Sequence, residues 1–130
     1  MIVDSSAMVA MLRGEPEARA FFGALTDEGT AGISAANYLE TAIVLDGKRD
    51  PVVSARLDTL LARLNVVIEP VTATQARIAR QAYRDFGRGS GHPAGLNFGD
   101  CFAYALAKAS GERSMFKGTD FAATDIEPYD

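Results

Sequence analysis

Four acidic residues stand where carboxylates could act together in chemistry: Asp4, Glu40, Asp100 and Asp120. Asp4 follows the first apolar run and Asp120 follows the last one, while Asp100 stands in the first turn of an apolar helical stretch. If the four side chains converge, carboxylates about 6 Å apart repel each other by about 3 kcal/mol per pair at an effective dielectric constant of about 20. Such a cluster requires protonation or a divalent cation. Because the ligands would be oxygen atoms, without a cysteine–histidine cluster, the cation would be Mg²⁺ or Mn²⁺ rather than Zn²⁺.

Local explanations are available for three of these acids. Asp4 can cap the helix that it precedes, and Asn97 with Asp100 has the pattern of a capping box. Asp120 can lie at a helix start, where a negative charge is favourable by about 0.3–1 kcal/mol. Glu40 lies too deep in its helical stretch for capping and has mainly apolar neighbours three and four residues away, so its side chain must reach water or meet a cation. Spacing alone therefore leaves capping and convergence both open.

The elements that must position these acids alternate between short apolar runs and longer helical stretches. Strands are predicted over residues 1–3, 30–34, 66–70 and 113–118. Helices are predicted over residues 4–12, 15–29, 34–47, 50–64, 72–87 and 96–111. Strands that alternate with helices indicate an α/β fold with a parallel sheet covered on both faces. Sheets of this kind bind ligands beyond the carboxyl ends of their strands, which is where several of the acids are expected.

The composition is typical of one cytoplasmic globular domain. The chain has 130 residues, of which 48% are hydrophobic and 23% are charged, and its single cysteine excludes an internal disulfide. No apolar run approaches the roughly 18 residues of a membrane-spanning helix. The net charge of −4 does not indicate a nucleic-acid partner, so a polyanion would require a local basic patch.

Other reactive residue types have simpler explanations. His92 lies in the glycine-rich stretch 87–95, which predicts a mobile loop residue rather than a general base. Cys101 lies on the apolar helical stretch and is expected to pack rather than to act as a nucleophile. Five basic residues could contact phosphates, although charges near helix ends are more often only solvated: Arg84, Arg88, Lys108, Arg113 and Lys117.

Four stretches together resemble a known family. "MIVDSSAMVAML", "SAANYLETAIVL", "LNFGDCFAYALAK" and "MFKGTDFAATDI" resemble, in that order, the four acidic motifs of PIN-domain ribonucleases, and they are most similar to the VapC toxins of type II toxin–antitoxin pairs. The resemblance covers essentially the whole chain and implies a single PIN domain over residues 1–130. It also implies a three-layer fold, with a parallel sheet of four to five strands flanked by helices.

The resemblance implies a role for particular residues. By position, Asp4, Glu40, Asp100 and Asp120 match the family's acids, which converge around one or two Mg²⁺ or Mn²⁺ ions. Ser6 matches a small hydroxyl residue that supports the first acid, and Asp125 matches a further acid with an indirect role. Ser5 stands where threonine is common, and no consequence of this difference is expected.

The implied activity is hydrolysis of RNA phosphodiester bonds, in tRNA or rRNA, by metal-activated water and without a nucleophilic side chain. The family further implies a homodimer and a VapB-type antitoxin. This partner wraps the toxin with a helical tail and can place an arginine in the acidic site.

Three alternatives fit the residues less well. A receiver-type phosphoacceptor domain requires paired acids after the first strand and an Asp ending the third, where this chain has Asp4-Ser5-Ser6 and Glu69-Pro70. A haloacid-dehalogenase-like phosphatase requires a second Asp where Ser6 stands. A PIN-fold binding module without activity is disfavoured because all four acids are present.

Overall fold

The computed structural model describes residues 1–118 and 121–129, so the predicted site residue Asp120 lies outside the described residues. Four short strands form one parallel sheet in the order β3-β2-β1-β4. They are β1 (Ile2–Val3), β2 (Ala31–Ser34), β3 (Val66–Glu69) and β4 (Ser114–Met115). The helices are α1 (Ser5–Arg13), α2 (Ala18–Glu28), α3 (Ala35–Asp46), α4 (Pro51–Arg63), α5 (Ala73–Phe86), α6 (Phe98–Ser110) and the short 3₁₀ helix η1 (Phe121–Ala123).

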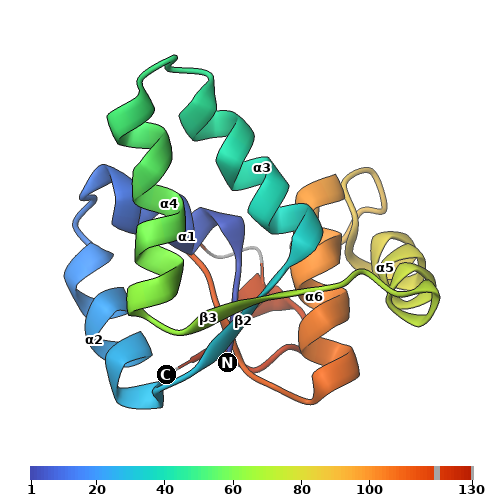
Figure 1. Ribbon diagram of the computed structural model, residues 1–130. Helices are drawn as coiled ribbons and strands as arrows, with labels where there is room; N and C mark the ends of the chain where they lie inside the picture. Colours follow the sequence, from blue (N-terminus) through green and yellow to red (C-terminus); the bar gives the residue numbers. More distant parts are fainter. Residues whose placement is uncertain (119–120, 130) are drawn as a thin grey trace.

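Helices cover both faces of this sheet, as predicted. α1, α2 and α4 lie on one face and α5 and α6 lie on the other, while α3 and α4 rise together beyond the sheet (Figure 1). The alternation of side chains along a strand divides the core between the two faces. Val3 and Ile33 belong to the core beneath α1, α2 and α4, whereas Ile2 belongs to the core beneath α5 and α6. The predicted three-layer α/β architecture is confirmed.

The strand order places the carboxyl ends of β1 and β4 side by side. β1 lies between β2 and β4, with Val3 paired to Met115, so the direction of strand addition reverses at β1. Crevices at such a reversal are the usual ligand sites of open parallel sheets. In the receiver-type order the third strand neighbours the first. Here β3 neighbours β2, so the receiver alternative is wrong.

Local capping sets where most helices begin. Ser34, Asp50, Thr72 and Asn97 cap their helices with side-chain oxygens, as their residue types predict. The second helix differs from its prediction, because it begins at Ala18 rather than near residue 15. Glu17 precedes it without a side-chain capping bond, and residues 15–17 form a turn instead.

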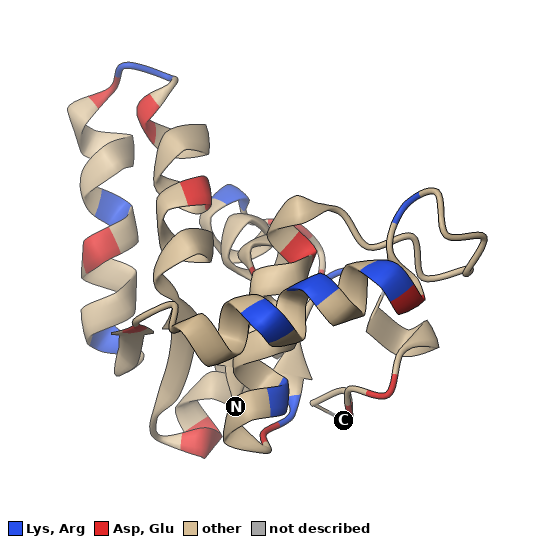
Figure 2. Cartoon of the chain, turned by 90° about the vertical axis from the view of Figure 1, so that its right-hand side faces the viewer, with Lys and Arg blue, Asp and Glu red and all other residues tan. Residues whose placement is uncertain are grey.

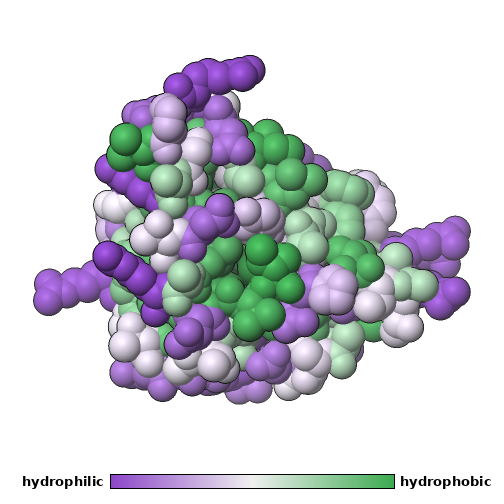
Figure 3. Space-filling view, viewed as in Figure 1, coloured by the Kyte–Doolittle hydropathy of each residue, from purple (hydrophilic) through white to green (hydrophobic). Residues whose placement is uncertain are grey.

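Hydrophobic side chains also reach the surface over β3 and along α3 (Figure 3). On the edge strand β3, Val67 and Ile68 are 54% and 42% exposed. On α3, Leu39 and Ile43 are 57% and 62% exposed. None of the helices in the described part of the chain is both long enough and apolar enough to cross a bilayer.

Candidate active site

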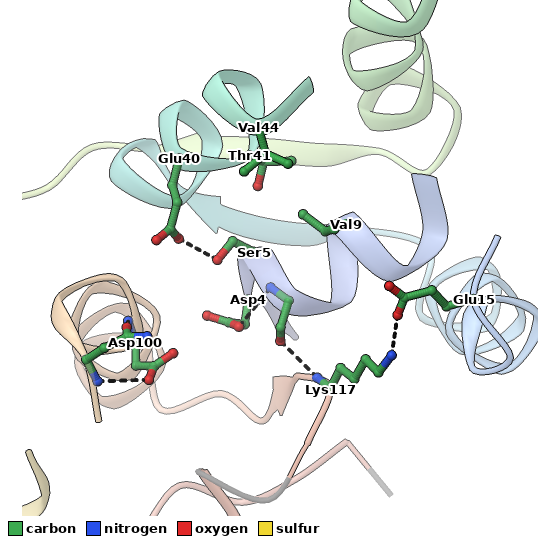
Figure 4. A pocket seen from close by; sticks show the side chains of 11 residues that line it. Asp4, Ser5, Val9, Glu15, Glu40, Thr41, Val44, Asp100 and Lys117 are labelled. Carbon is green, nitrogen blue, oxygen red and sulfur yellow. Dashed lines mark hydrogen bonds and ion pairs between the residues drawn. The ribbon is translucent and has the colours of Figure 1, made fainter. Parts of the chain in front are cut away.

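An open cleft of about 350 Å³ lies at the carboxyl edge of the sheet, between the ends of β1 and β4 and the helices α1, α3 and α6 (Figure 4). Three of the predicted acids line it, and they come from three different elements: Asp4, Glu40 and Asp100. The structure therefore brings these residues together although 36 and 60 positions separate them along the chain. The convergence that spacing left open is present for the three acids that lie in the described residues.

Asp4 is the most deeply placed of these acids, with 1% of its surface exposed. It caps α1, because its Oδ2 accepts a hydrogen bond of 2.9 Å from the backbone N–H of Ser6. Its other oxygen, Oδ1, is buried and accepts no hydrogen bond within the described part of the chain. Burial raises the pKa of Asp4 to about 6, against the effect of the Ser6 hydrogen bonds, and the charges of Asp100 and Glu40 raise it further. Capping therefore accounts for Oδ2 of Asp4 but not for its buried Oδ1.

Glu40 enters the cleft from α3 and is exposed, so its side chain can reach water as well as a cation in the cleft. The Ser5 hydroxyl donates a hydrogen bond of 2.5 Å to Glu40 Oε1 (Figure 4). The amide group of Asn37, one turn earlier, donates a hydrogen bond of 3.3 Å to the same oxygen and one of 2.9 Å to the carbonyl oxygen of Gly99. The buried Asn37 thus holds α3 against the start of α6 and orients Glu40 between them.

Asp100 opens α6 within a complete capping box. Its Oδ2 accepts from the backbone N–H of Asn97, and its own N–H donates to Asn97 Oδ1, both at 2.9 Å. Gly99 precedes it at a position where a Cβ atom would lie 2.8 Å from the Cδ of Glu40. A side chain at this position would displace the Glu40 carboxylate, so Gly99 leaves room for Glu40 beside the start of α6. Sequence reasoning did not identify Gly99, Asn37 or Ser5 as part of the site, because each acts through a contact between distant segments.

A lysine lies at the rim of the cleft. The backbone N–H of Lys117 donates a hydrogen bond of 2.9 Å to Ser6 Oγ, and its ammonium group pairs with Glu15 (Figure 4). The ammonium group also lies 3.6 Å from a carboxylate oxygen of Glu17. The hydrogen bond and the charge of Glu15 raise the pKa of Lys117, so it remains protonated. These contacts fix the end of β4 beside the start of α1, and Ser6 connects them to Asp4.

The remaining predicted residues lie elsewhere. Asp125 does not line the cleft. Its carboxylate accepts a hydrogen bond of 2.6 Å from the Tyr104 hydroxyl and one of 2.5 Å from the Lys108 ammonium group, both on α6. Cys101 is buried, and burial raises the pKa of its thiol to about 11, so it packs as predicted and does not act as a thiolate. His92 stays in its loop, where Nδ1 accepts from the backbone N–H of Ala94.

The donor set fits a hard divalent cation. The cleft offers carboxylate oxygens, and the buried Asp4 Oδ1 lacks a hydrogen-bond donor among the described residues. Within residues 1–118 and 121–129, no group of three His, Cys, Asp or Glu side chains is close enough to ligate one ion directly. Mg²⁺ typically takes one or two carboxylates and keeps several water molecules, so the arrangement fits an ion held partly through water.

A parallel α/β sheet with an acidic cleft where its strand order reverses can hold a divalent cation. The family model described as PIN domain matches residues 1–127, and the chain belongs to this family. Ribonuclease VapC28 of Mycobacterium tuberculosis is 56% identical over 127 residues, which are 98% of this chain and 96% of that protein. PIN-domain ribonucleases of the VapC type are generally metal-dependent, which agrees with the donor set.

Solved structures share the fold at low sequence identity. A toxin–antitoxin complex from Klebsiella pneumoniae contains a chain with a TM-score of 0.73 and 15% identity, covering 99% of this chain and 97% of that one. VapC20 of Mycobacterium tuberculosis, described as a sarcin–ricin loop cleaving toxin, has a TM-score of 0.73 and 18% identity, covering 96% and 95%. The predicted family and fold are confirmed.

Proposed function

We propose that this chain is a single PIN domain acting as the toxin of a type II toxin–antitoxin pair, and that it is a metal-dependent endoribonuclease. The observation that carries the proposal is the buried Asp4 carboxylate, whose Oδ1 has no hydrogen-bond donor in the described part and which shares a cleft with Glu40 and Asp100. A buried charge of this kind requires compensation, which a cation supplies. Relatives named as VapC ribonucleases, 56% identical over nearly the whole chain, support the same activity.

Asp4 and Asp100 are proposed as the principal ligands of Mg²⁺ or Mn²⁺, with Glu40 and Asp120 completing the acidic site. A bound divalent cation would lower the pKa of a water molecule for attack on phosphorus and would compensate charge on the phosphate. Mg²⁺ is the first choice, because the cleft is open and its ligands are carboxylate oxygens.

The chain's own residues fix the carboxylates before substrate binds. The Ser6 backbone N–H holds one oxygen of Asp4, and the other, which has no hydrogen-bond donor among the described residues, would be available to ligate a cation. Asn97 fixes the Asp100 carboxylate through the capping box, and Ser5 fixes Glu40. Asp125 would act indirectly, by anchoring the segment after η1 to α6. Such preorganisation reduces the reorganisation that the reaction would otherwise require.

The proposed partners are a VapB-type antitoxin, a second copy of the chain in a homodimer, and a tRNA or rRNA substrate in the cytoplasm. A toxin–antitoxin complex among the structural neighbours is compatible with the first of these. The catalytically silent PIN module remains the competing hypothesis, and it predicts that no divalent metal supports cleavage.

The test is cleavage of total tRNA and rRNA by the purified protein with Mg²⁺, with Mn²⁺ and with a chelator. We expect cleavage only with metal, and none by Asp100→Asn at unchanged thermal stability. Asp27→Asn, which removes an exposed charge from α2, is the matched control and should cleave like the wild type. Metal-dependent cleavage that survives in Asp100→Asn would contradict the proposed site.

A further inference from the structure

A second groove, of about 570 Å³, lies between α5 and the start of α6, and is here named the α5–α6 groove. Its lining combines two cations, three aromatic rings and one amide: Arg80, Arg88, Tyr83, Phe98, Phe102 and Asn97. Asn97 lines this groove and also the acidic cleft, so the two are neighbours across one side chain. The acidic cleft and the α5–α6 groove therefore adjoin at Asn97.

The α5 side of the groove is basic. Arg77, Arg80 and Arg84 are spaced by three and four residues and lie on one side of the helix, and Arg88 follows in the loop. Figure 2 shows these basic residues recurring along α5. All four are exposed, and none forms an ion pair within the described residues. In a chain with a net charge of −4, this is a local basic patch beside an acidic site.

Two aromatic rings flank the groove. Phe98 is 79% exposed, although it begins α6 two residues before Asp100, and its ring forms a T-shaped pair with that of Phe102, with 4.8 Å between centroids. Tyr83 is 48% exposed, and its hydroxyl donates 3.1 Å to the carbonyl oxygen of Arg88. Exposed rings interleaved with arginines are the composition of a surface that stacks bases and holds phosphates.

We infer that the α5–α6 groove binds the single-stranded RNA segment that adjoins the cleaved phosphate. In this arrangement Arg80 and Arg88 contact backbone phosphates, and Phe98 stacks on a base close to the cleft. The inference rests on the proposed ribonuclease function and extends it, because it gives the substrate a path and a single-stranded form. A second copy related by a two-fold axis through the groove would bring the same arginines to it, so charge favours a polyanion as the occupant.

A third groove provides the matched control. It lies between α1, α2 and α4 and contains Arg56 and Arg63, but it shares no lining residue with the acidic cleft. Both of these arginines are exposed and form no ion pair in the described part of the chain. The variant Arg56→Gln/Arg63→Gln therefore changes the net charge as much as Arg80→Gln/Arg88→Gln does, at a groove that does not lead to the site.

The experiment measures binding of a fluorescein-labelled, mixed-sequence single-stranded RNA of about 16 nucleotides, a length typical of single-strand sites. Fluorescence anisotropy is recorded in chelator, so that cleavage does not interfere, between about 50 mM and 200 mM salt. Each lost phosphate contact lowers the slope of log K against log salt by about 0.7, so Arg80→Gln/Arg88→Gln should lower it by about 1.4. At 0.15 M salt this corresponds to about tenfold weaker binding.

The other variants separate stacking from charge. Phe98→Ala should weaken binding about fivefold or more with an unchanged salt slope, because stacking releases no counterions. Arg56→Gln/Arg63→Gln should bind like the wild type. Equal binding by the two double variants would overturn the inference. It would also be overturned if Arg80→Gln/Arg88→Gln lost binding together with a lower molar mass in light scattering, because a second copy of the chain would then be the occupant of the groove.

Cleavage of total RNA with Mg²⁺ or Mn²⁺ is measured on the same preparations. If the wild type cleaves RNA and Arg80→Gln/Arg88→Gln binds and cleaves equally well, the role of the α5–α6 groove is refuted. The proposed ribonuclease function is then unaffected. A wild type that cleaves no RNA would remove the proposed function and the inference with it.

Discussion

Replacing Asp4 by asparagine is expected to stabilise the metal-free protein and to abolish cleavage. Asparagine has nearly the same shape, and its Oδ1 can still accept the hydrogen bond from the Ser6 N–H that caps α1. It removes a buried negative charge whose Oδ1 has no hydrogen-bond donor in the described residues and which lies close to the charges of Glu40 and Asp100. The same change removes the proposed metal ligand.

The magnitude follows from the pKa. A rise of the Asp4 pKa from 3.8 to about 6 means that ionising this group in the folded protein costs about 3 kcal/mol at pH 8. The buried amide N–H₂ group must find an acceptor, which offsets part of the gain. We therefore expect Asp4→Asn to raise the free energy of unfolding by about 1–3 kcal/mol. For a chain of 130 residues this is a rise in Tm of about 4–11 °C.

The raised pKa of Asp4 also determines how the stability advantage of Asp4→Asn changes with pH. Between pH 3.8 and about 6 the folded state of the wild type binds the Asp4 proton and the unfolded state releases it, so this group lowers stability as pH rises through that window. The advantage of Asp4→Asn should accordingly be full at pH 8, about half as large near pH 5 and nearly absent at about pH 3. Urea unfolding in chelator at these pH values measures it, with Asp27→Asn as the control for a lost surface charge. An Asp4→Asn variant that is less stable than the wild type at pH 8 would refute the reasoning.

Three further predictions concern the supports of the site. Gly99→Ala should fold but cleave poorly, because its Cβ would displace the flexible Glu40 carboxylate. The control Gly23→Ala, in open space on α2, should retain activity and gain up to about 1 kcal/mol in free energy of unfolding; activity assays and urea unfolding compare the two. Tyr104→Phe should lose about 1 kcal/mol of stability with wild-type cleavage, since Asp125 keeps its contact with Lys108; reduced cleavage would assign Asp125 a closer role. Millimolar Mg²⁺ or Mn²⁺ should raise the Tm of the wild type, by an amount equivalent to about 2.7 kcal/mol at a hundredfold excess over Kd, but not that of Asp4→Asn.

The fold and the family were predictable from the sequence because their signals are local. Strand and helix patterns, caps at Ser34, Asp50 and Asn97, and the four acidic motifs can all be read from neighbouring residues. The start of α2 was misplaced, because Pro16 suggested a first helical turn where the structure has a turn without a side-chain cap.

The supports of the site could not be predicted in the same way. The contacts of Ser5 with Glu40, Asn37 with Gly99 and Lys117 with Ser6 span 35, 62 and 111 positions. No local pattern encodes such pairs, because they exist only after the parallel crossovers have aligned the carboxyl ends of the strands. For the same reason, capping and convergence looked like alternatives for Asp4 and Asp100. The structure shows both at once, with one oxygen of Asp4 in the cap and the other buried without a donor in the described residues.

The central claim is hydrolysis of RNA by metal-activated water in the cleft of Asp4, Glu40 and Asp100. The most direct test is the chemistry of the new RNA ends after incubation of total RNA with the purified protein and Mg²⁺ or Mn²⁺. Attack by water gives one phosphomonoester and one free hydroxyl at each cut, so we predict ends free of 2′,3′-cyclic phosphate, formed by the wild type only with metal and not by Asp4→Asn. Cyclic phosphate ends would show that the RNA's own 2′-hydroxyl is the nucleophile, and cuts that persist in chelator would show that no divalent metal is required. Either result would contradict the account.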